Sequence, residues 1–395
     1  MNERIHELML NVAAHPAGWP LARISRRVGK VIHIPGFGTI VNDASLAHDI
    51  LTDDANFTKN GQGSIADTMT SLLGPFALGN MDGEMHRMLR AKLRDVFSPA
   101  QSALLLESQR GWFNALSEDL AQGKSVDLVD WIRILSGRLT FDMLGVPLPD
   151  DSDPACRELV LLGESIASGI DFRKPHPRKL AVTQQKCERL AGYIRHGYES
   201  ASSPPASLIF RLRAAGLTFD EAKGVLSLVF LAGTLTTAAA FPRITALLID
   251  SGRLPALRQT SAWAPPAIAE GLRYVAPVPA TVRIAQGDML IHGRQIAAGE
   301  RMIILTCNLA RDSTLFEQPD VFDPQRQHDP RSRNLWFGAG SHFCLGFSLA
   351  QQQLKRALEA LTSGDRELEI VSRRYGGRAI VPSYKSLVLR AATPS

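Results

Sequence analysis

The stretch FGAGSHFCLG, residues 337 to 346, combines three glycines with one cysteine, Cys344. Glycine permits tight turns and lets backbone N–H groups approach a neighbouring atom closely. After the cysteine, apolar residues recur at spacings of three and four, which predicts a helix that begins close to the sulfur. The positive end of that helix would stabilise a thiolate. This stretch therefore predicts a cysteine that can bind a metal through its deprotonated sulfur.

The other cysteines are scattered along the chain, with neither a CxxC pair nor a zinc-type motif: Cys156, Cys187 and Cys307. We interpret them as small buried apolar side chains, which suits a reducing compartment. The amino terminus alternates charged and apolar residues and lacks the apolar stretch of a signal peptide. We therefore expect a cytoplasmic protein without a membrane anchor.

The composition is that of a folded globular protein, with 45% apolar and 21% charged residues among 395. The net charge of +5 and the pI of about 9.1 weakly favour an acidic partner. No run of Lys and Arg with interleaved aromatic residues occurs in the sequence, so nucleic acid is not an expected partner.

Residues 83–273 and 344–363 predict a helix-rich body, because their apolar residues recur mostly at spacings of three and four. Segments rich in β-branched residues predict a smaller β part over residues 30–41, 281–305 and 366–390. We expect an α+β fold that is mainly α. Since no linker divides the chain, we expect a single domain over residues 1–395.

One long segment carries no charge: GVLSLVFLAGTLTTAAAFP, residues 224–242. It is long enough to raise the question of a membrane span. Glycine and threonine interrupt its apolar character, and no second hydrophobic span accompanies it. A helix that is apolar all round is equally typical of the centre of a large soluble protein. We predict a buried central helix.

The pattern F-x-x-G-x-x-x-C-x-G, with His342 two residues before the cysteine, resembles the cysteine loop of the cytochrome P450 family. The resemblance implies the cytochrome P450 fold, in which a long central helix crosses over a haem and the cysteine loop lies beneath it. It implies haem b as the cofactor, with Cys344 as the axial thiolate ligand of the iron. It also implies that Phe337, Gly338, His342 and Gly346 contribute to the haem site.

Two further motifs match the family in the expected order. Glu270 and Arg273 fit its E-x-x-R; residues three apart share one helix face, so they can pair and hold the core near the haem. The following segment YVAPVPATVR ends in Arg283, and the resemblance implies that this arginine contacts a haem propionate. For Glu270 and Arg273 the alternative is a solvated surface pair.

His86 and Arg90 lie four residues apart, which places both on one face of a predicted helix. Their segment, DGEMHRMLR, resembles the family's helix whose His and Arg reach the haem propionates. Two cations there can neutralise carboxylates at the edge of an apolar cofactor. The alternative is an ordinary basic helix.

The segment AGTLTT, residues 232–237, resembles the family's A-G-x-(acid)-T-T in the central helix. The resemblance implies that Gly233 and Thr236 are catalytic, because this part of the helix lies on the oxygen-binding side of the haem and the threonine hydroxyl steadies dioxygen and relays protons. Leu235 replaces the acid, and leucine cannot carry a proton. The alternative is that Thr236 bonds only to helix carbonyls.

These motifs predict a haem-thiolate monooxygenase that oxidises a small hydrophobic molecule, by hydroxylation, with O2. No flavin or iron-sulfur segment follows the cysteine loop in this sequence, so the expected electron donors are a ferredoxin and its reductase. Because ferredoxins are typically acidic, the candidate docking residues are basic: Arg87, Arg94, Lys355 and Arg356. Two alternatives stay open: a peroxide-using or rearranging enzyme, because of Leu235, and a haem sensor without catalysis.

Overall fold

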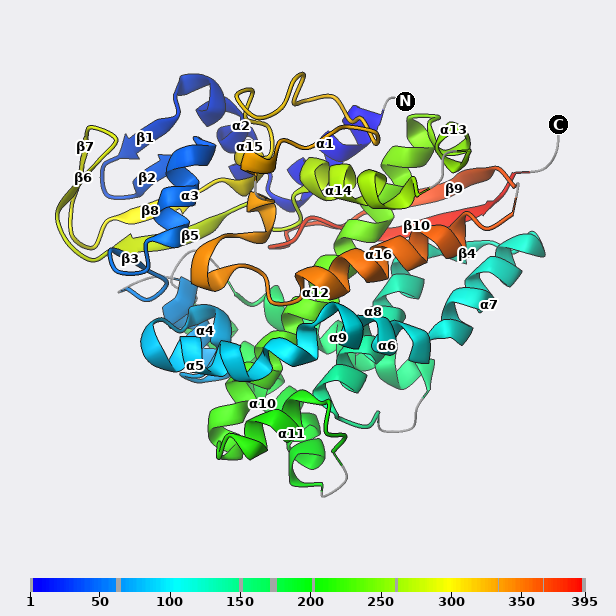
Figure 1. The fold of residues 1–395 in the computed structure, drawn as a ribbon, viewed down its shortest axis with the longest axis horizontal. Coiled ribbons are helices and arrows are strands. Elements are labelled where there is room, and N and C mark those ends of the chain that lie inside the picture. Colours follow the sequence, from blue (N-terminus) through cyan, green and yellow to red (C-terminus); the bar gives the residue numbers. More distant parts are fainter. Residues whose placement is uncertain are drawn as a thin grey trace.

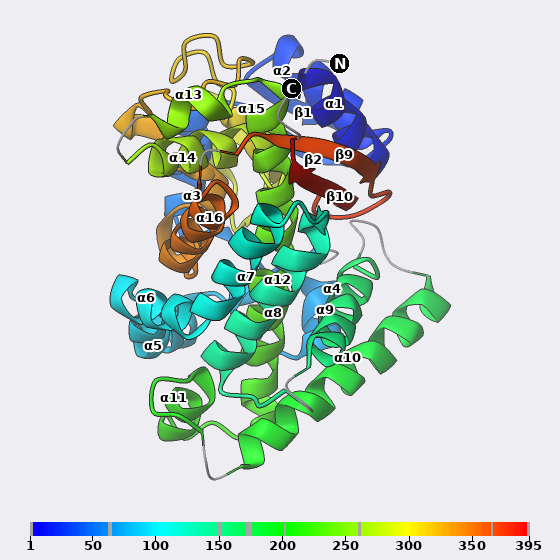
Figure 2. The ribbon, with the colours of Figure 1, turned by 90° about the vertical axis from the view of Figure 1, so that its right-hand side faces the viewer.

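The long helix α12 (Phe219–Asp250) runs through the middle of the molecule (Figure 1; Figure 2). The computed structural model describes residues 3–61, 65–148, 152–170, 176–200, 203–259, 262–332, 334–364 and 366–392. A capping box begins α12: the Thr218 hydroxyl accepts a hydrogen bond from the Glu221 N–H, and the Glu221 carboxylate accepts one from the Thr218 N–H at 2.7 Å. Pro242 lies inside α12 without ending it.

Burial explains the apolar character of α12. Among the described residues it is the one helix long and apolar enough to cross a membrane, and 67% of its most apolar window is buried inside the protein. This agrees with the predicted central helix, since a helix in the middle of a large core has neighbours on every side.

Helices make up most of the described chain. Those before α12 are α1 (Glu3–Ala14), α2 (Gly18–Val28), α3 (Ala44–Thr52), α4 (Ile65–Leu73), α5 (Gly83–Leu93), α6 (Pro99–Ser108), α7 (Arg110–Ala121), α8 (Leu128–Leu144), α9 (Asp153–Ala167), α10 (Pro177–Glu199) and α11 (Leu208–Ala214). Those after it are α13 (Leu254–Arg258), α14 (Ala264–Val275), α15 (Thr306–Leu309) and α16 (Phe347–Leu361). Short 3-10 turns are η1 (Leu78–Asn80), η2 (Arg94–Phe97), η3 (Pro330–Ser332), η4 (Leu335–Phe337) and η5 (Gly340–His342).

Three sheets form the smaller β part. The largest has the strand order β1-β2-β8-β5-β3, from β1 (Val31–Ile34), β2 (Gly38–Val41), β3 (Phe57–Thr58), β5 (Thr281–Ala285) and β8 (Arg301–Ile304). Only β2 and β8 pair in parallel within it. The second has the order β4-β10-β9, from β4 (Val126–Asp127), β9 (Leu368–Tyr375) and β10 (Tyr384–Ala391). The hairpin β6 (Met289–Ile291) and β7 (Arg294–Ile296) forms the third.

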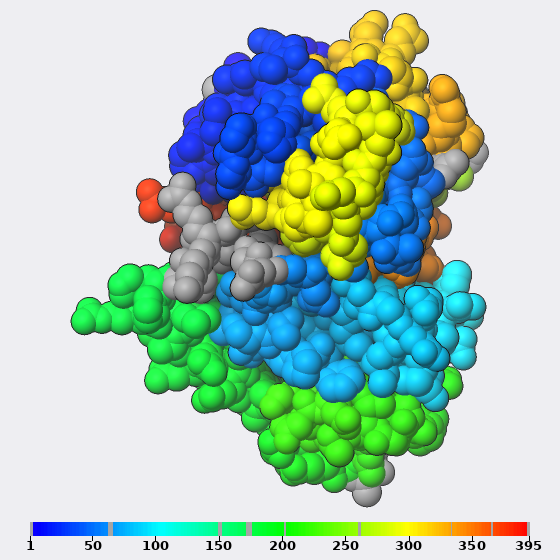
Figure 3. All heavy atoms as spheres, turned by 90° about the vertical axis from the view of Figure 1, so that its left-hand side faces the viewer, coloured from blue at the N-terminus to red at the C-terminus, as the bar shows by residue number. Residues whose placement is uncertain are grey.

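The sheets and the helices occupy different parts of the molecule. Figure 3 shows one face on which the amino-terminal segment and the β6–β7 region lie above the green surface of the α10–α11 region. Both chain termini lie on the same side, near β9 and β10 (Figure 1). The expected α+β fold, mainly α with a smaller β part, is confirmed.

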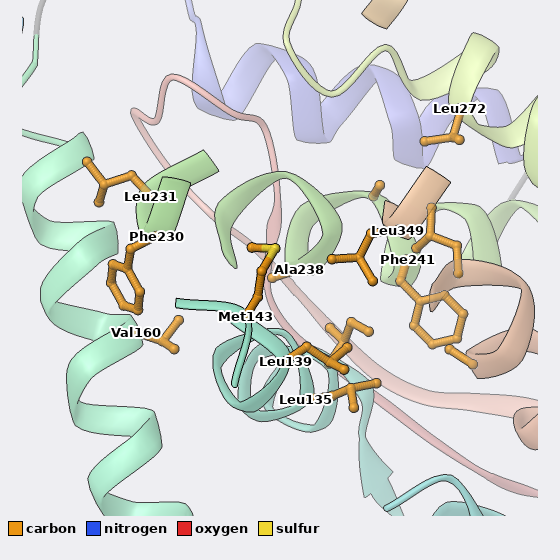
Figure 4. Close-up of a cluster of buried hydrophobic side chains, with 14 of the residues drawn as sticks. Leu135, Leu139, Met143, Val160, Phe230, Leu231, Ala238, Phe241, Leu272 and Leu349 are labelled. Atoms are coloured by element: carbon orange, nitrogen blue, oxygen red, sulfur yellow. The ribbon is translucent and has the colours of Figure 1, made fainter. Parts of the chain in front are cut away.

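The main hydrophobic core surrounds α12 and α8 and extends to α9, α14 and α16. In Figure 4 side chains from these helices converge on one region, among them Leu139, Met143, Val160, Phe230 and Leu349. Each fully buried side chain of this size contributes about 1.5–3 kcal/mol. The core therefore holds α12 rigidly, with one stretch of it facing a cavity.

Candidate functional site

The cysteine loop occupies the turn between η4 and α16. The Cys344 N–H donates a hydrogen bond to the Phe337 carbonyl at 3.0 Å, and the Phe347 N–H donates to the Cys344 carbonyl at 3.3 Å. Gly338 and Gly340 have φ angles of +79° and +64°, a backbone conformation that favours glycine. These turns bring the cysteine to the amino terminus of α16, as the glycine spacing predicts.

The Cys344 sulfur lies in two opposing environments. Burial raises the pKa of its thiol, because a thiolate loses hydration there, while the Gly346 N–H and the Arg90 guanidinium lower that pKa. Burial has the larger effect and the pKa is raised, so without a bound metal the Cys344 side chain is a neutral thiol. A metal ion bonded to the sulfur would reverse this balance, since a coordinating thiol loses its proton.

A cavity of about 350 Å³ separates the cysteine loop from α12. Its lining is mainly apolar and includes nine of the residues singled out in the sequence: Arg90, Gly233, Thr236, Arg283, Phe337, Gly338, His342, Cys344 and Gly346. These residues come from α5, α12, β5, η4, η5 and the start of α16. The fold thus brings segments some 250 residues apart to one space.

On the α12 side, Ala232, Gly233 and Thr236 line the cavity. The Thr236 hydroxyl donates a hydrogen bond to the Ala232 carbonyl at 2.9 Å, which is the back-bonded state considered as the alternative. Because the hydroxyl uses its proton in this bond, its oxygen is left with acceptor lone pairs. Leu235 packs against the hydrophobic core and is not among the lining residues.

A network of hydrogen bonds between buried polar side chains, which the sequence did not predict, lies beside the cavity. The Gln353 side-chain amide donates to the Ser136 hydroxyl at 2.8 Å, and that hydroxyl lies 2.9 Å from the Thr237 hydroxyl. Thr237 in turn donates to the Gly233 carbonyl at 3.0 Å. These hydrogen bonds link α16, α8 and α12, and Gln353 and Thr237 line the cavity. No local spacing connects these residues, so sequence patterns could not reveal it.

Two cations, Arg90 and Arg283, line the cavity together with the His342 ring. Arg90 donates to the Phe343 carbonyl at 2.6 Å, Arg283 donates to the Val282 carbonyl at 3.1 Å, and His342 Nε2 lies 3.1 Å from an Asp82 oxygen. Burial lowers the pKa of Arg283 to about 10, although Asp82 and Asp54 oppose this. A cluster of half-satisfied buried cations favours an anionic ligand.

His86 differs from the other predicted residues, because it does not line the cavity. Its ring stacks on His342 with 4.3 Å between centroids, and its Nε2 is buried without a hydrogen-bond partner among the described residues. Burial, together with His342 and Arg90, lowers the pKa of His86 to about 4, so the ring is neutral at pH 7. An orphaned ring nitrogen at this edge is the mark of a missing hydrogen-bond partner.

Lys59 is a cavity-lining cation that the sequence analysis missed. Its Nζ donates to the Thr281 hydroxyl at 3.1 Å. No motif includes this lysine, and its place follows only from the pairing of β3 with β5.

Glu270 and Arg273 lie outside the cavity, in α14, and are completely buried. Their two-pronged ion pair has N–O distances of 2.7 and 2.8 Å. Arg273 also donates to the carbonyls of Ala310, Pro319 and Val321, while Glu270 accepts from Arg326 and the Asp323 N–H. A solvated surface pair is therefore the wrong interpretation. The pair instead fastens the segment that leads to the cysteine loop.

The donor set fits a haem. Among the described residues no group of three or more His, Cys, Asp or Glu side chains could hold a metal ion. A single thiol facing an apolar cavity suits an iron whose other ligands arrive with it, in a porphyrin. Arg90 and Arg283 line the cavity, and the orphaned His86 nitrogen lies behind His342; the carboxylates of such a group would need partners of this kind.

Comparisons with known proteins agree with this geometry. The family model described as Cytochrome P450 matches residues 264–362. Linalool 8-monooxygenase from Pseudomonas putida is 27% identical over 74% of this chain and 72% of its own length. Cytochrome P450 119 from Sulfolobus acidocaldarius is 26% identical over 78% of this chain and 79% of its own.

A solved structure with a similar fold is P450BioI in complex with an acyl carrier protein that carries hexadec-9Z-enoic acid. It has a TM-score of 0.84 and 22% sequence identity, and the match covers 97% of this chain and 99% of that one. With the cysteine loop, the central helix and the buried ion pair of α14 in their expected places, the chain belongs to the cytochrome P450 family, in its bacterial type.

Proposed function

We propose that Cys344 is the axial thiolate ligand of a haem b and that the chain hydroxylates a small hydrophobic molecule. The family and the fold make the protein a haem-thiolate monooxygenase, and the finer assignments follow from the cavity. The supporting observation is that Cys344 lines the same cavity as Gly233 and Thr236 of α12. A haem bound through a thiolate supplies electron density that favours O–O cleavage.

Residues of this chain would stabilise the thiolate, bind the haem carboxylates and hold the cysteine loop in place. Gly346 N–H and Arg90 stabilise the sulfur as an anion. Arg90 and Arg283 would neutralise the haem carboxylates, His342 would hydrogen-bond to them, and His86 would donate through its unpartnered nitrogen. Phe337, Gly338 and Gly346 shape the loop around the sulfur, and Glu270 with Arg273 holds the preceding segment in place.

The substrate belongs to the class of small hydrophobic molecules. Apolar side chains dominate the cavity lining, including Leu78, Leu139, Val229 and Val278. One curated relative is named for linalool, and one solved relative of similar fold is described with testosterone. A titration of the ferric protein with hydrophobic compounds, followed by its haem spectrum, identifies ligands that displace water from the iron.

The electron donors in this proposal are a ferredoxin and its reductase, in the cytoplasm. Arg87 and Arg94 are exposed on α5 and η2. On the neighbouring α16, Lys355 pairs with Glu359 at 3.6 Å and Arg356 with Glu107 at 3.7 Å. Lys355 and Arg356 already pair with glutamates, so Arg87 and Arg94 are the better candidates for binding an acidic partner.

A second candidate is an enzyme that uses peroxide or rearranges its substrate. Leu235 supports it, because an apolar residue packed into the core stands where an acid would deliver protons. Product formation with peroxide alone, compared with product formation with a ferredoxin system and O2, distinguishes the two candidates.

The test of the iron ligand is a spectrum of the haem-loaded protein. We expect the thiolate type of reduced carbon monoxide spectrum from the natural chain and from Cys187→Ala, a buried cysteine in α10. Cys344→Ala should lose this spectrum. If Cys344→Ala keeps it, or if the natural chain gives the histidine-ligated type, the proposal is wrong.

A further inference from the structure

Lys59 is held at the cavity edge by two strands and a loop. It follows β3, which pairs with β5 through Thr58 and Ile284. The Lys59 N–H donates to an Asp82 oxygen at 2.9 Å, and its Nζ donates to the Thr281 hydroxyl at 3.1 Å. Backbone and side chain are thus both fixed, so the ammonium group has a defined position among the lining residues.

The Lys59 ammonium has no carboxylate partner among the described residues. Arg283 is a second cation beside it; Asp82 opposes both charges, and Asp54 also opposes that of Arg283. The Asp82 carboxylate already accepts from the Lys59 and Asn60 N–H groups and from His342. Burial, with repulsion from Arg283, lowers the pKa of Lys59 to about 7. Among the described residues, neither the Lys59 ammonium nor the Arg283 guanidinium is paired with a carboxylate; they donate to the Thr281 hydroxyl and the Val282 carbonyl.

We infer that Lys59 binds a propionate carboxylate of the haem, as a further cationic donor beside Arg283. The inference rests on the proposed function, since it requires haem in the cavity. It adds a residue outside the recognised motifs to the haem site. An ammonium beside a guanidinium at the edge of an apolar cavity is a carboxylate site by its chemistry, because each cation gains a charge-assisted hydrogen bond there.

A carboxylate could also arrive with a substrate. Both sources would use the same ammonium group, but they differ in what the loss of Lys59 changes. A propionate contact affects how tightly the haem is held, whereas a substrate contact affects only the preference for acidic over neutral ligands.

The experiment compares Lys59→Met, which keeps the shape of the side chain without its charge, with Lys59→Arg, which keeps the charge. Lys385→Met, on the exposed face of β10, is the matched control. The rate of haem transfer from each ferric holoprotein to excess apomyoglobin is measured after the reduced carbon monoxide spectrum has verified thiolate ligation.

We expect Lys59→Met to lose haem roughly tenfold faster, the effect of one hydrogen bond between charged groups. Lys59→Arg should stay within about threefold of the natural chain, because it keeps the charge-assisted hydrogen bond. The control should not change. The iron midpoint potential of Lys59→Met should also fall, since a nearby positive charge that favours the reduced state is removed.

Haem loss at the natural rate in Lys59→Met would overturn the inference. Spectral titrations with a long-chain fatty acid and with its methyl ester then identify the other source: a lost preference for the acid, with haem loss unchanged, assigns Lys59 to the substrate. Failure of the natural chain to show thiolate ligation is a different result, which would overturn the proposed function.

Discussion

At the residue scale, the hydroxyl of Thr236 and the side chain of Leu235 define the chemistry that this P450 can perform. Thr236 lines the cavity and donates its proton to the Ala232 carbonyl, so in this state it offers acceptor lone pairs. Leu235 offers no proton at all. Proton delivery must then use water or another hydroxyl, and Thr237 with Ser136 lies one helical position further along the same wall.

Thr236→Val should uncouple oxygen consumption from product formation, because valine keeps the shape but loses the hydroxyl. We expect product per NADPH to fall by roughly tenfold or more, with a matching rise in hydrogen peroxide, since the hydroxyl oxygen would no longer position the water that delivers the proton, and positioned proton transfer contributes about 10²–10⁴-fold. Thr236→Ser should recover most of the coupling. The measurement is the ratio of product and peroxide to NADPH consumed.

Thr234→Val is the matched control for this prediction. Thr234 lies in the same helix, is completely buried and bonds to the Phe230 carbonyl at 2.8 Å, but it does not line the cavity. Its replacement should leave the product ratio unchanged. Equal uncoupling by both valine variants would mean that helix geometry, rather than the Thr236 hydroxyl, controls proton delivery.

At the element scale, two buried arginines tie distant segments to the central helices. Arg243 of α12 pairs with Glu7 of α1 and donates to the Val275 carbonyl at 2.9 Å and the Pro382 carbonyl at 3.2 Å. Arg273 of α14 donates to the carbonyls of Ala310 and Pro319 and so holds the irregular segment before the cysteine loop. That segment has little regular secondary structure. The arginine side chain therefore satisfies backbone carbonyls that would otherwise need the hydrogen bonds of a helix or a sheet.

Glu270→Gln should destabilise the fold by about 3–5 kcal/mol at pH 7, because it leaves Arg273 buried without its counter-charge. Urea unfolding followed by far-UV circular dichroism measures the loss. Glu199→Gln, in an exposed pair of α10, is the control and should cost less than about 1 kcal/mol. A small effect of Glu270→Gln would mean that the segment is held mainly by its other contacts.

The same glutamate predicts a pH dependence. Burial raises the pKa of Glu270, but hydrogen bonds from Arg273 and His328 outweigh burial and lower that pKa from 4.5 to about 2. A depressed carboxyl pKa stabilises the folded state fully above pH 4.5, and this contribution disappears as the pH falls towards 2. The natural chain should therefore lose stability across this window, and Glu270→Gln should lose less.

At the scale of the whole molecule, the net charge of +5 has a predicted use on the face that carries α5, η2 and α16. The double variant Arg87→Glu, Arg94→Glu should slow reduction by an acidic ferredoxin about tenfold or more at low salt, because steering by opposite charges is lost. The difference should shrink as salt screens the charges. Stopped-flow reduction at several ionic strengths measures both effects.

Arg178→Glu, an exposed residue at the start of α10, is the control for this charge reversal. It changes the net charge but not the proposed docking face. Suppose that one reversed charge at Arg178 slows reduction as much as each reversed charge of the double variant. The overall charge of the protein, rather than a local docking surface, then governs the encounter with ferredoxin.

The sequence alone determined the fold class, the central helix and the cysteine loop, because each depends on residues close together in the chain. Three glycines around Cys344, the spacing of Glu270 and Arg273, and a long uncharged segment occur in the order that the resemblance to the family implies, and together they favour one interpretation. The structure places Cys344, Thr236, Arg90, Arg283 and His342 around one cavity. Their roles toward the haem stay predictions.

Tertiary structure decided what depends on distant segments meeting. Lys59 reaches the cavity only because β3 pairs with β5, and Ser136 joins Thr237 to Gln353 only because α8, α12 and α16 meet there. His86 stacks behind His342 rather than lining the cavity. Helical and strand periodicity report the local face of a residue, whereas a cavity is formed by packing between elements, which no local spacing contains.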